Sequence, residues 1–226
     1  RTKGASLIYT SSASVYGLLS SVCNEDSPVH PQGPYAAAKY ETEQKIERLI
    51  DNYITLRINA PYGKKQRSKT VLRIFIERAL AGLDLLYHGS GKRQQDFVAV
   101  EDVAIVITYA VSFKGTGEII NIASGNSISM KNLAELIIHT IPGTMSRVLA
   151  SGQIDPQEDY RAIFDISKSN HVLGWSPSVS LKDGIRRWAS YIVSKKMKVG
   201  LLSDVHGNYV GLNVCLNFFS KKRVEK

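Results

Sequence analysis

The sequence lacks any hydrophobic run long enough to cross a bilayer, since no apolar stretch approaches about 18 residues. It has only two cysteines, Cys23 and Cys215, far apart, which excludes a disulfide-rich scaffold. No cleavable signal is evident at its start, so we expect a cytoplasmic location and no membrane partner. What is present is an ordinary globular composition of 226 residues, 43% hydrophobic and 22% charged, which excludes a disordered chain.

The net charge of +9 raises the alternative of a nucleic-acid-binding protein. Residues 195–226 alone contribute +5 of that excess, and the rest of the chain carries only +4. No helix-turn-helix, zinc-finger or RNA-binding aromatic signature occurs. We therefore expect no nucleic-acid partner and interpret the basic tail as a solvated segment.

Hydrophobic periodicity predicts strands that alternate with helices. Short apolar runs predict the strands, at residues 6–10, 53–58, 85–88, 96–100 and 118–122. Apolar residues at three-to-four spacing predict helices at 35–52, 69–81, 101–113, 129–141 and 180–196, with Ser129 capping the fourth. This alternation indicates an α/β fold with a mostly parallel sheet.

The strongest chemical signal is the segment Tyr35-Ala-Ala-Ala-Lys39. Residues at i and i+4 lie on one helix face, one turn apart. A lysine ammonium favours the phenolate form of a nearby tyrosine, which can then exchange a proton with an alcohol. Ser12, expected at the end of the first strand, can orient the same oxygen. The pattern also arises by chance in helices, so it indicates an acid/base site only together with Ser12 and the Pro61-Tyr-Gly segment.

Several ordered motifs make the sequence resemble the NAD-dependent epimerase/dehydratase family, a branch of the extended short-chain dehydrogenase/reductases. The motifs are Ser11-Ser-Ala-Ser-Val-Tyr-Gly17, Pro34-Tyr-Ala-Ala-Ala-Lys39, Leu56-Arg-Ile-Asn-Ala-Pro-Tyr-Gly63, Asp96-Phe-Val-Ala-Val-Glu-Asp102, Asn121-Ile-Ala-Ser-Gly125 and Leu173-Gly-Trp-Ser-Pro177. The resemblance implies the C-terminal part of a Rossmann-type parallel sheet plus a small α/β substrate-binding region, within residues 1–194.

The resemblance also implies roles for individual residues. Ser12, Tyr35 and Lys39 would be catalytic. NAD would be contacted by Thr10, Tyr35, Lys39 and Pro61, with NADP left open. A nucleotide-sugar substrate would contact Ser12, Ala60, Arg93 and Gln95. A homodimer through the helix that bears Tyr35 is the arrangement that the family suggests.

The residues after Ser12 bear on the type of reaction. Family members that remove water carry an Asp-Glu pair where this sequence has Ala13-Ser14, so the pattern is closer to the UDP-glucose 4-epimerases. Two departures concern the diphosphate: the family's usual arginine before Asp96 is Gln95, with Arg93 two residues earlier, and a second expected arginine is replaced at best by Arg161. These changes weaken the expectation of a UDP-sugar.

A Rossmann-type cofactor site needs a glycine-rich turn after its first strand, and none occurs here. Gly89-Ser-Gly91 is no substitute, because it lacks a third glycine and no helix is expected after it. We therefore expect that roughly the first 100 residues of a complete enzyme are missing. The alternative function is a catalytically inert fragment, or a module that needs a partner chain.

The last segment has a different character. Residues 197–220 resemble the start of a calcineurin-like metallophosphoesterase, with Asp204 and His206 in the places of metal ligands. Such two-metal sites need further ligands from later segments. We therefore expect no complete metal site in the basic tail 195–226, and hydrolysis of phosphoesters is the least favoured function.

Overall fold

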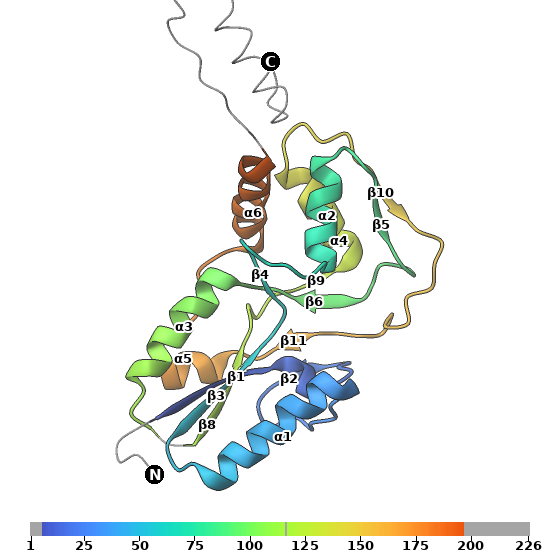
Figure 1. Cartoon of the computed structure of the whole chain (residues 1–226). Coiled ribbons are helices and arrows are strands. Elements are labelled where there is room, and N and C mark those ends of the chain that lie inside the picture. Colours follow the sequence, from blue (N-terminus) through green and yellow to red (C-terminus); the bar gives the residue numbers. More distant parts are fainter. Residues whose placement is uncertain (1–5, 116, 197–226) are drawn as a thin grey trace, which may run out of the picture.

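We describe a computed structural model of the chain, in which residues 6–115 and 117–196 are placed. Its central sheet has three parallel strands, β1 (Leu7–Ser12), β3 (Tyr53–Ile58) and β8 (Glu118–Ile122), in the order β1-β3-β8. Helix α1 (Gly33–Leu49) covers one face of this sheet, and α3 (Val100–Ser112) and α5 (Ser167–Leu173) cover the other (Figure 1). The predicted α/β fold with a Rossmann-type parallel sheet is confirmed.

The side chains of β3 alternate between the two faces of the sheet, so the strand packs against the helices on both sides. Ile54 and Leu56 are fully buried and pack with residues of α3 and α5. Thr55 and Arg57, which alternate with them, are buried on the face that α1 covers. The sheet therefore has an apolar face and a face that carries polar groups into the protein interior.

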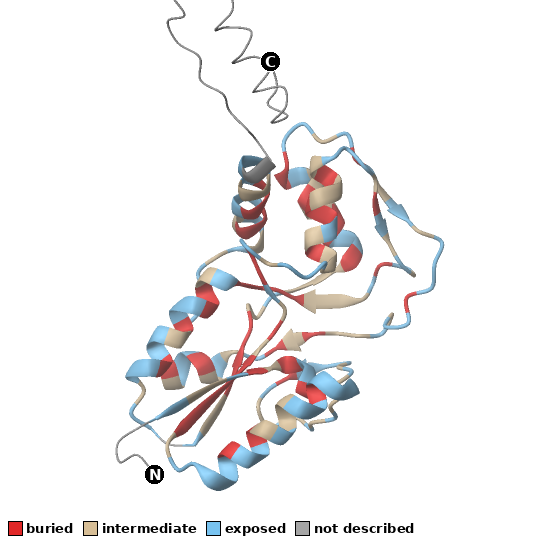
Figure 2. Cartoon of the chain, in the orientation of Figure 1, coloured by how far each residue is buried: buried red, intermediate tan, exposed pale blue. Residues whose placement is uncertain are grey.

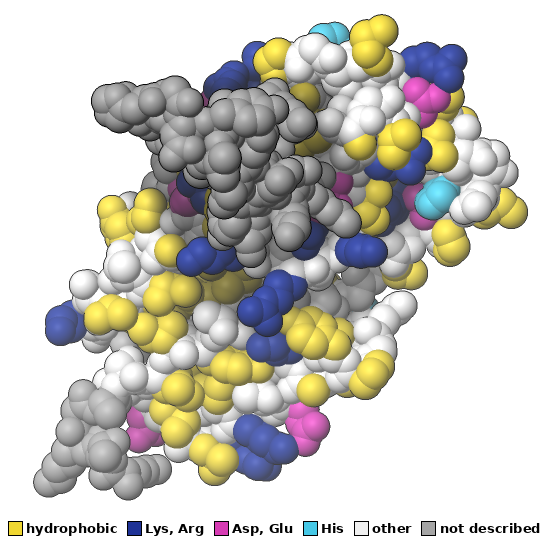
Figure 3. Space-filling model, turned by 45° about the horizontal axis from the view of Figure 1, so that its top comes forward, with side chains coloured by type: hydrophobic (Ala, Val, Ile, Leu, Met, Phe, Trp, Pro, Cys, Tyr) yellow, Lys and Arg dark blue, Asp and Glu magenta, His cyan; other side chains and the backbone are white. Residues whose placement is uncertain are grey.

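The outer edge of β1 carries no partner strand in the part of the chain that the structure describes. Leu7, at the start of β1, is 37% exposed on this strand. An open edge of this kind presents unpaired backbone groups that another strand can pair with. Helix α3 carries further exposed apolar residues, among them Ile105 and Tyr109, and hydrophobic side chains are spread over the lower half of the face in Figure 3.

A second region lies beyond the carboxyl ends of the central strands. It is built from α2 (Val71–Leu80), α4 (Met130–Thr140) and α6 (Leu181–Lys196), whose buried sides face one another (Figure 2). The strands β5 (Leu85–Tyr87) and β10 (Val148–Ala150) pair in parallel, and β6 (Gln94–Asp96) pairs antiparallel with β9 (Ser127–Ser129). This is the small α/β region that the sequence predicted.

Close packing of this second region requires a glycine at one position. A Cβ atom at Gly184 in α6 would collide with the ring and hydroxyl of Tyr62. Tyr62 is 3% exposed and contacts Phe97 and Trp188, so its ring has no room to retreat.

Short elements join the two regions. The strand β2 (Val22–Cys23) pairs with β11 (Ile163–Phe164), and β4 (Pro61–Tyr62) pairs with β7 (Val98–Ala99). A 3-10 helix, η1 (Ala13–Tyr16), follows β1 directly. None of the described helices is both long and apolar enough to cross a membrane. The tail resemblance at residues 197–220 lies outside the described residues.

Candidate active site

Helix α1 places Tyr35 and Lys39 at the sheet. The helix begins at Gly33, which has a φ of 78°, and Pro34 stands in its first turn, where a missing N–H costs nothing. Tyr35 is 62% exposed, so its hydroxyl is open to a ligand. The Lys39 Nζ atom lies 5.9 Å from the centroid of the Tyr35 ring. The predicted spacing of one turn therefore does bring the two side chains together.

Lys39 also ties α1 to the end of β1. Its Nζ atom donates a hydrogen bond to the carbonyl oxygen of Thr10 at 2.8 Å and lies 5.0 Å from the centroid of the Tyr9 ring. An ammonium group has three protons to donate. One of them is used by Thr10, which leaves donors for hydroxyl groups of a ligand.

Ser12 ends β1 and caps η1. Its Oγ atom accepts hydrogen bonds from the backbone N–H of Ser14 at 3.2 Å and from the Ser14 hydroxyl at 2.9 Å. Both bonds use lone pairs of Ser12, so its own proton stays available for a substrate oxygen. Ser12 stands two residues after Thr10, about 7 Å further along the strand. The same strand end thus carries Ser12 and the carbonyl that Lys39 binds.

The segment after β3 contains Ala60 and Pro61, the first residue of β4, and it starts beside this strand end because Ile58 pairs with Ser12. Asn59 fixes it, because its backbone N–H donates to the carbonyl of Ile122 at 2.9 Å and its Nδ2 atom donates to the carbonyl of Asp96 at 2.8 Å. Ala60 has a φ of 32°, a region that residues with a side chain rarely occupy. The backbone at Ala60 is therefore strained and held by its neighbours.

Arg93 and Gln95, the two residues that the resemblance assigned to the substrate, have different surroundings. Gln95 lies within β6, opposite Ile128 of β9. The Arg93 Nε atom lies 3.0 Å from a carboxylate oxygen of Asp155, and Nη1 donates to Gln157 at 3.2 Å. A diphosphate would have to compete with Asp155 for this guanidinium. Arg161 does not join them in the described hydrogen bonds, since its Nη1 atom donates to backbone carbonyls of residues 158 and 160.

A buried polar cluster on the α1 face of the sheet was not predicted from the sequence. The Arg57 Nη2 atom donates to Glu43 of α1 at 2.7 Å, and Nη1 donates to the hydroxyl of Tyr16 at 2.9 Å. The Tyr16 hydroxyl in turn donates to Oδ1 of Asn121 at 2.8 Å. A charged residue in the middle of the apolar strand at 53–58 was the available signal, because a buried arginine needs a partner.

Burial controls the protonation of this cluster. It raises the pKa of Tyr16 to about 12, despite an opposing effect of the Arg57 charge. Burial works against the charge on Arg57, but its hydrogen bonds with Glu43 and Tyr16 leave the pKa of Arg57 raised overall. Tyr16 therefore stays a hydroxyl donor, and among the residues at this strand end Tyr35 is the exposed phenol.

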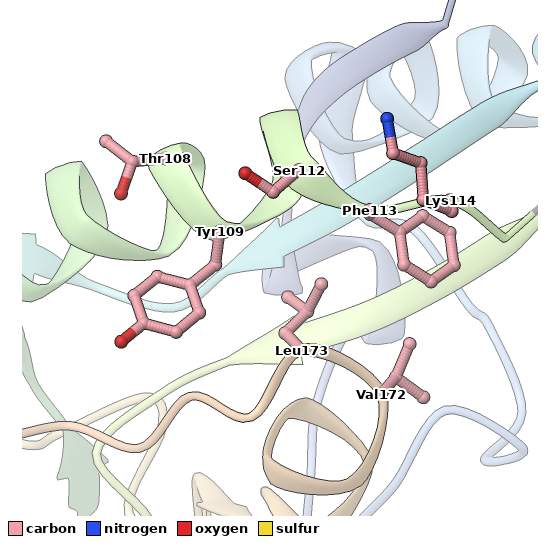
Figure 4. A pocket seen from close by; sticks show the side chains of 7 residues that line it. All are labelled: Thr108, Tyr109, Ser112, Phe113, Lys114, Val172 and Leu173. Carbon is pink, nitrogen blue, oxygen red and sulfur yellow. The ribbon is translucent and has the colours of Figure 1, made fainter.

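A cavity of about 560 Å³ lies elsewhere. It is lined by Tyr109 of α3, by Phe113 just after that helix, and by Val172 and Leu173 of α5, among others (Figure 4). These helices cover the face of the sheet opposite α1, so we do not assign this cavity to the site. Among the described residues no group of three or more His, Cys, Asp or Glu side chains could hold a metal ion. Asp204 and His206 lie outside those residues.

Comparison with known proteins decides the family. The model of the NAD dependent epimerase/dehydratase family matches residues 1–123, more than half of the chain. This chain belongs to that family. The match contains the two segments that carry Ser12, Tyr35 and Lys39, and the resemblance inferred from the motifs is confirmed.

Individual members of the epimerase/dehydratase family differ in reaction. A Methanocaldococcus jannaschii protein, whose name assigns it provisionally to the UDP-glucose 4-epimerases, is 34% identical over 178 residues, which are 75% of this chain and 56% of the relative. The human dTDP-D-glucose 4,6-dehydratase is 30% identical over 190 residues, which are 80% of this chain and 54% of the relative. The chain thus spans little more than half the length of these relatives.

A solved structure agrees with the fold. The UDP-glucose 4-epimerase of Thermotoga maritima, determined with UDP-glucose, superposes with a TM-score of 0.74 at 29% identity, over 84% of this chain and 63% of the other. The dTDP-glucose 4,6-dehydratase of Bacillus anthracis also superposes, with a TM-score of 0.71 at 21% identity, over 84% of this chain and 62% of the other. Both structures share the architecture described here, so the architecture alone does not separate epimerisation from dehydration.

Proposed function

We propose that the protein carrying this chain is an NAD-dependent nucleotide-sugar epimerase of the 4-epimerase type. The observation that supports it most is the position of Lys39, whose amine binds the Thr10 carbonyl and lies beside the ring of Tyr35. This arrangement suits a tyrosine that moves a proton between its phenol and a sugar hydroxyl.

The site has groups that fit a nicotinamide cofactor. The ammonium of Lys39 has donors left for ribose hydroxyls, and Thr10, Tyr35 and the Ala60-Pro61 segment are the further contacts that we propose for NAD. NAD would supply the acceptor for the hydride of the sugar carbon, a task that no side chain can perform. NADP remains the alternative, since no described residue bears on the adenosine ribose.

The chain's own residues would then act in order on the substrate. Ser12 donates its free proton to the sugar oxygen and orients it, and Tyr35 takes the proton of the hydroxyl as the carbon is oxidised. Lys39 stabilises the phenolate by its charge. After the sugar turns over in the site, Tyr35 returns the proton as the carbon is reduced from its other face. Ala60, Arg93 and Gln95 complete the proposed substrate contacts.

The 4-epimerase type is favoured over dehydration by the residues that follow Ser12. Dehydration needs an acid and a base to remove water, and Ala13 has neither. The Ser14 hydroxyl is hydrogen-bonded to Ser12. A substrate of the nucleotide-sugar class is favoured by the relatives, several of which are named for UDP- or dTDP-sugars.

A catalytically inert or partner-dependent chain is the second candidate. The open outer edge of β1 favours it, because β1 pairs on one side only among the described strands, and the sequence contains no glycine-rich cofactor turn. Hydrolysis of phosphoesters rests only on Asp204 and His206, outside the described residues.

Two measurements test these candidates. Titration of NAD into the purified chain separates them, since micromolar binding contradicts an inert chain and no binding supports a partner-dependent one. Incubation of the NAD-loaded protein with UDP-glucose then separates the reactions. Formation of the C4 epimer supports the proposal, whereas release of a 4-keto-6-deoxy sugar would establish dehydration instead.

A further inference from the structure

Arg57 is the point where the two elements that carry the proposed catalytic groups meet. Glu43, its first partner, stands on α1 one helical turn after Lys39 and two turns after Tyr35. Tyr16, its second partner, is the last residue of η1, the turn that Ser12 caps. The guanidinium of Arg57 makes both contacts, and Arg57 belongs to β3, the central strand of the sheet.

The geometry of the contacts makes Arg57 a rigid link. Its Nε and Nη2 atoms both bind the Glu43 carboxylate, at 3.2 and 2.7 Å, so the planar guanidinium fork is oriented by two donors. Its carbon Cζ also lies 4.8 Å from the centroid of the Tyr16 ring. The exposed fractions of the Arg57 and Glu43 side chains are 4% and 3%, so water does not compete for these bonds.

The other charged and polar groups around Arg57 complete the link. The Tyr16 hydroxyl accepts from Arg57 and donates to Asn121 of β8, and the backbone N–H of Asn121 donates to the carboxylate of Glu25 at 2.7 Å. The cluster thus joins η1, α1, β3 and β8. A buried cluster of hydrogen-bonded polar groups can fix one arrangement of the elements that it joins, even where it adds little stability.

We propose that Arg57 is a positioning residue, which holds α1 with Tyr35 and Lys39 at a fixed distance from the Ser12 turn. The importance of Arg57 for catalysis rests on the function proposed above, whereas its role in setting the distance between α1 and η1 does not. An ion pair that only stabilised the fold could be replaced by apolar side chains of similar size without moving either element. A pair that positions α1 and η1 could not be replaced in this way, because the apolar side chains would not make the hydrogen bond that Arg57 donates to Tyr16 of η1.

A distance measurement on the full chain tests this. Nitroxide labels are attached to cysteines introduced at two exposed positions, Leu18→Cys just after η1 and Gln44→Cys on α1. The two native cysteines, Cys23 and Cys215, are replaced by alanine so that only the introduced cysteines carry a label. Pulsed electron paramagnetic resonance then gives the distribution of distances between the two elements. No turnover is needed, so failure of the proposed reaction does not affect the result.

The variants separate positioning from stability. Arg57→Met leaves Glu43 buried without its partner and is expected to broaden and shift the distance distribution. The double variant Glu43→Met with Arg57→Met removes both charges, and we expect its melting temperature to stay near that of the unmutated chain while its distribution is still broadened. Tyr16→Phe removes one oxygen, leaves the Arg57–Glu43 ion pair in place, and is also expected to broaden the distribution.

Two controls match these changes. Asp84→Asn breaks the Asp84–Arg147 ion pair in the second region, and Ile137→Val removes one buried methyl group from α4. Both are expected to keep the narrow distribution of the unmutated chain. An unchanged distribution in Tyr16→Phe and in the folded double variant would overturn the proposal and reduce Arg57 to a structural residue.

Discussion

The Lys39 ammonium donates a hydrogen bond of 2.8 Å to the carbonyl oxygen of Thr10, which joins the first turns of α1 to the end of β1. A backbone carbonyl is a fixed acceptor, so it holds the lysine charge at one place beside the Tyr35 ring. The position of the lysine charge is thereby set by the backbone of β1.

Removing the Tyr16 hydroxyl should destabilise the chain. In Tyr16→Phe, a donor of Arg57 and an acceptor of Asn121 lose a buried partner, which should cost about 1–3 kcal/mol in the free energy of unfolding. Urea unfolding followed by circular dichroism measures this loss. Tyr109→Phe, which changes an exposed tyrosine of α3, is the matched control and should leave the free energy of unfolding within experimental error.

The same variant should change the stability of the chain in alkaline solution. Because the folded-state pKa of Tyr16 is raised to about 12, the folded chain keeps a proton that the unfolded chain loses near pH 10. Tyr16 therefore contributes stability that is present below about pH 10 and is lost as the pH rises through 12. Unfolding at pH 9 to 12 should show a smaller decline in Tyr16→Phe. Equal declines in both chains would contradict the assigned burial of this phenol.

The carboxyl groups of Asp96 and Asp84 should change the stability of the chain in opposite directions as the solution becomes acidic. Burial raises the pKa of Asp96, despite hydrogen bonds from Ser124, so its contribution to stability is present below about pH 4 and lost as the pH rises through its folded value. The hydrogen bond from Arg147 lowers the pKa of Asp84, whose contribution is present above about pH 4 and lost as the pH falls.

Unfolding between pH 3 and 7 checks both signs. As the pH increases, the free energy of unfolding of Asp96→Asn should decline less, or rise more, than that of the unmutated chain. Asp84→Asn should lower the free energy of unfolding at neutral pH and change it little at pH 3. The same sign of change in both variants would show that one of these two environments is wrongly described.

The strained backbone at Ala60 predicts a stabilising substitution. Glycine adopts a φ of 32° without the clash of a Cβ atom, so Ala60→Gly should raise the free energy of unfolding by about 1 kcal/mol at most. Ala104→Gly, at an exposed position within α3, is the control and should lower it by about 1 kcal/mol. A loss of stability in both variants would show that Ala60 is not strained.

Local patterns predicted the larger elements of the fold. The strand Tyr53–Ile58 has the predicted bounds, and the Ser129 hydroxyl accepts from the N–H of Asn132, as expected of a helix cap. The helix at 35–52 begins two residues earlier and ends at Leu49, because helix ends depend on caps more than on periodicity. These elements carry their signal within a window of a few turns.

Elements created by pairing between distant segments were missed. The two- and three-residue strands β2, β9, β10 and β11 have too few residues for a period to show, and they exist because their partners lie beside them. The seven-residue helix α5 was missed for its shortness. Arg57 likewise has partners 14 and 41 residues away along the sequence, which no spacing rule could have supplied.

The part of the proposed site that lies within one element was predictable from local spacing, and the part that depends on distant segments was not. The spacing of Tyr35 and Lys39 lies within one helix, and the structure places them side by side, with Lys39 also at Thr10. Arg93 was assigned to the substrate by resemblance, but its ion pair with Asp155 depends on a loop more than sixty residues further on. The roles of Ser12, Ala60, Pro61, Arg93 and Gln95 stay predictions.

Turnover of the Tyr35→Phe variant tests the central claim most directly. The assay follows C4 epimerisation of a UDP-sugar by the NAD-loaded protein, with Tyr109→Phe as the control and NAD binding measured in parallel. Loss of the proton-transferring phenol should lower turnover by about 10²- to 10⁴-fold, with NAD binding retained. Undiminished turnover in Tyr35→Phe would contradict the account.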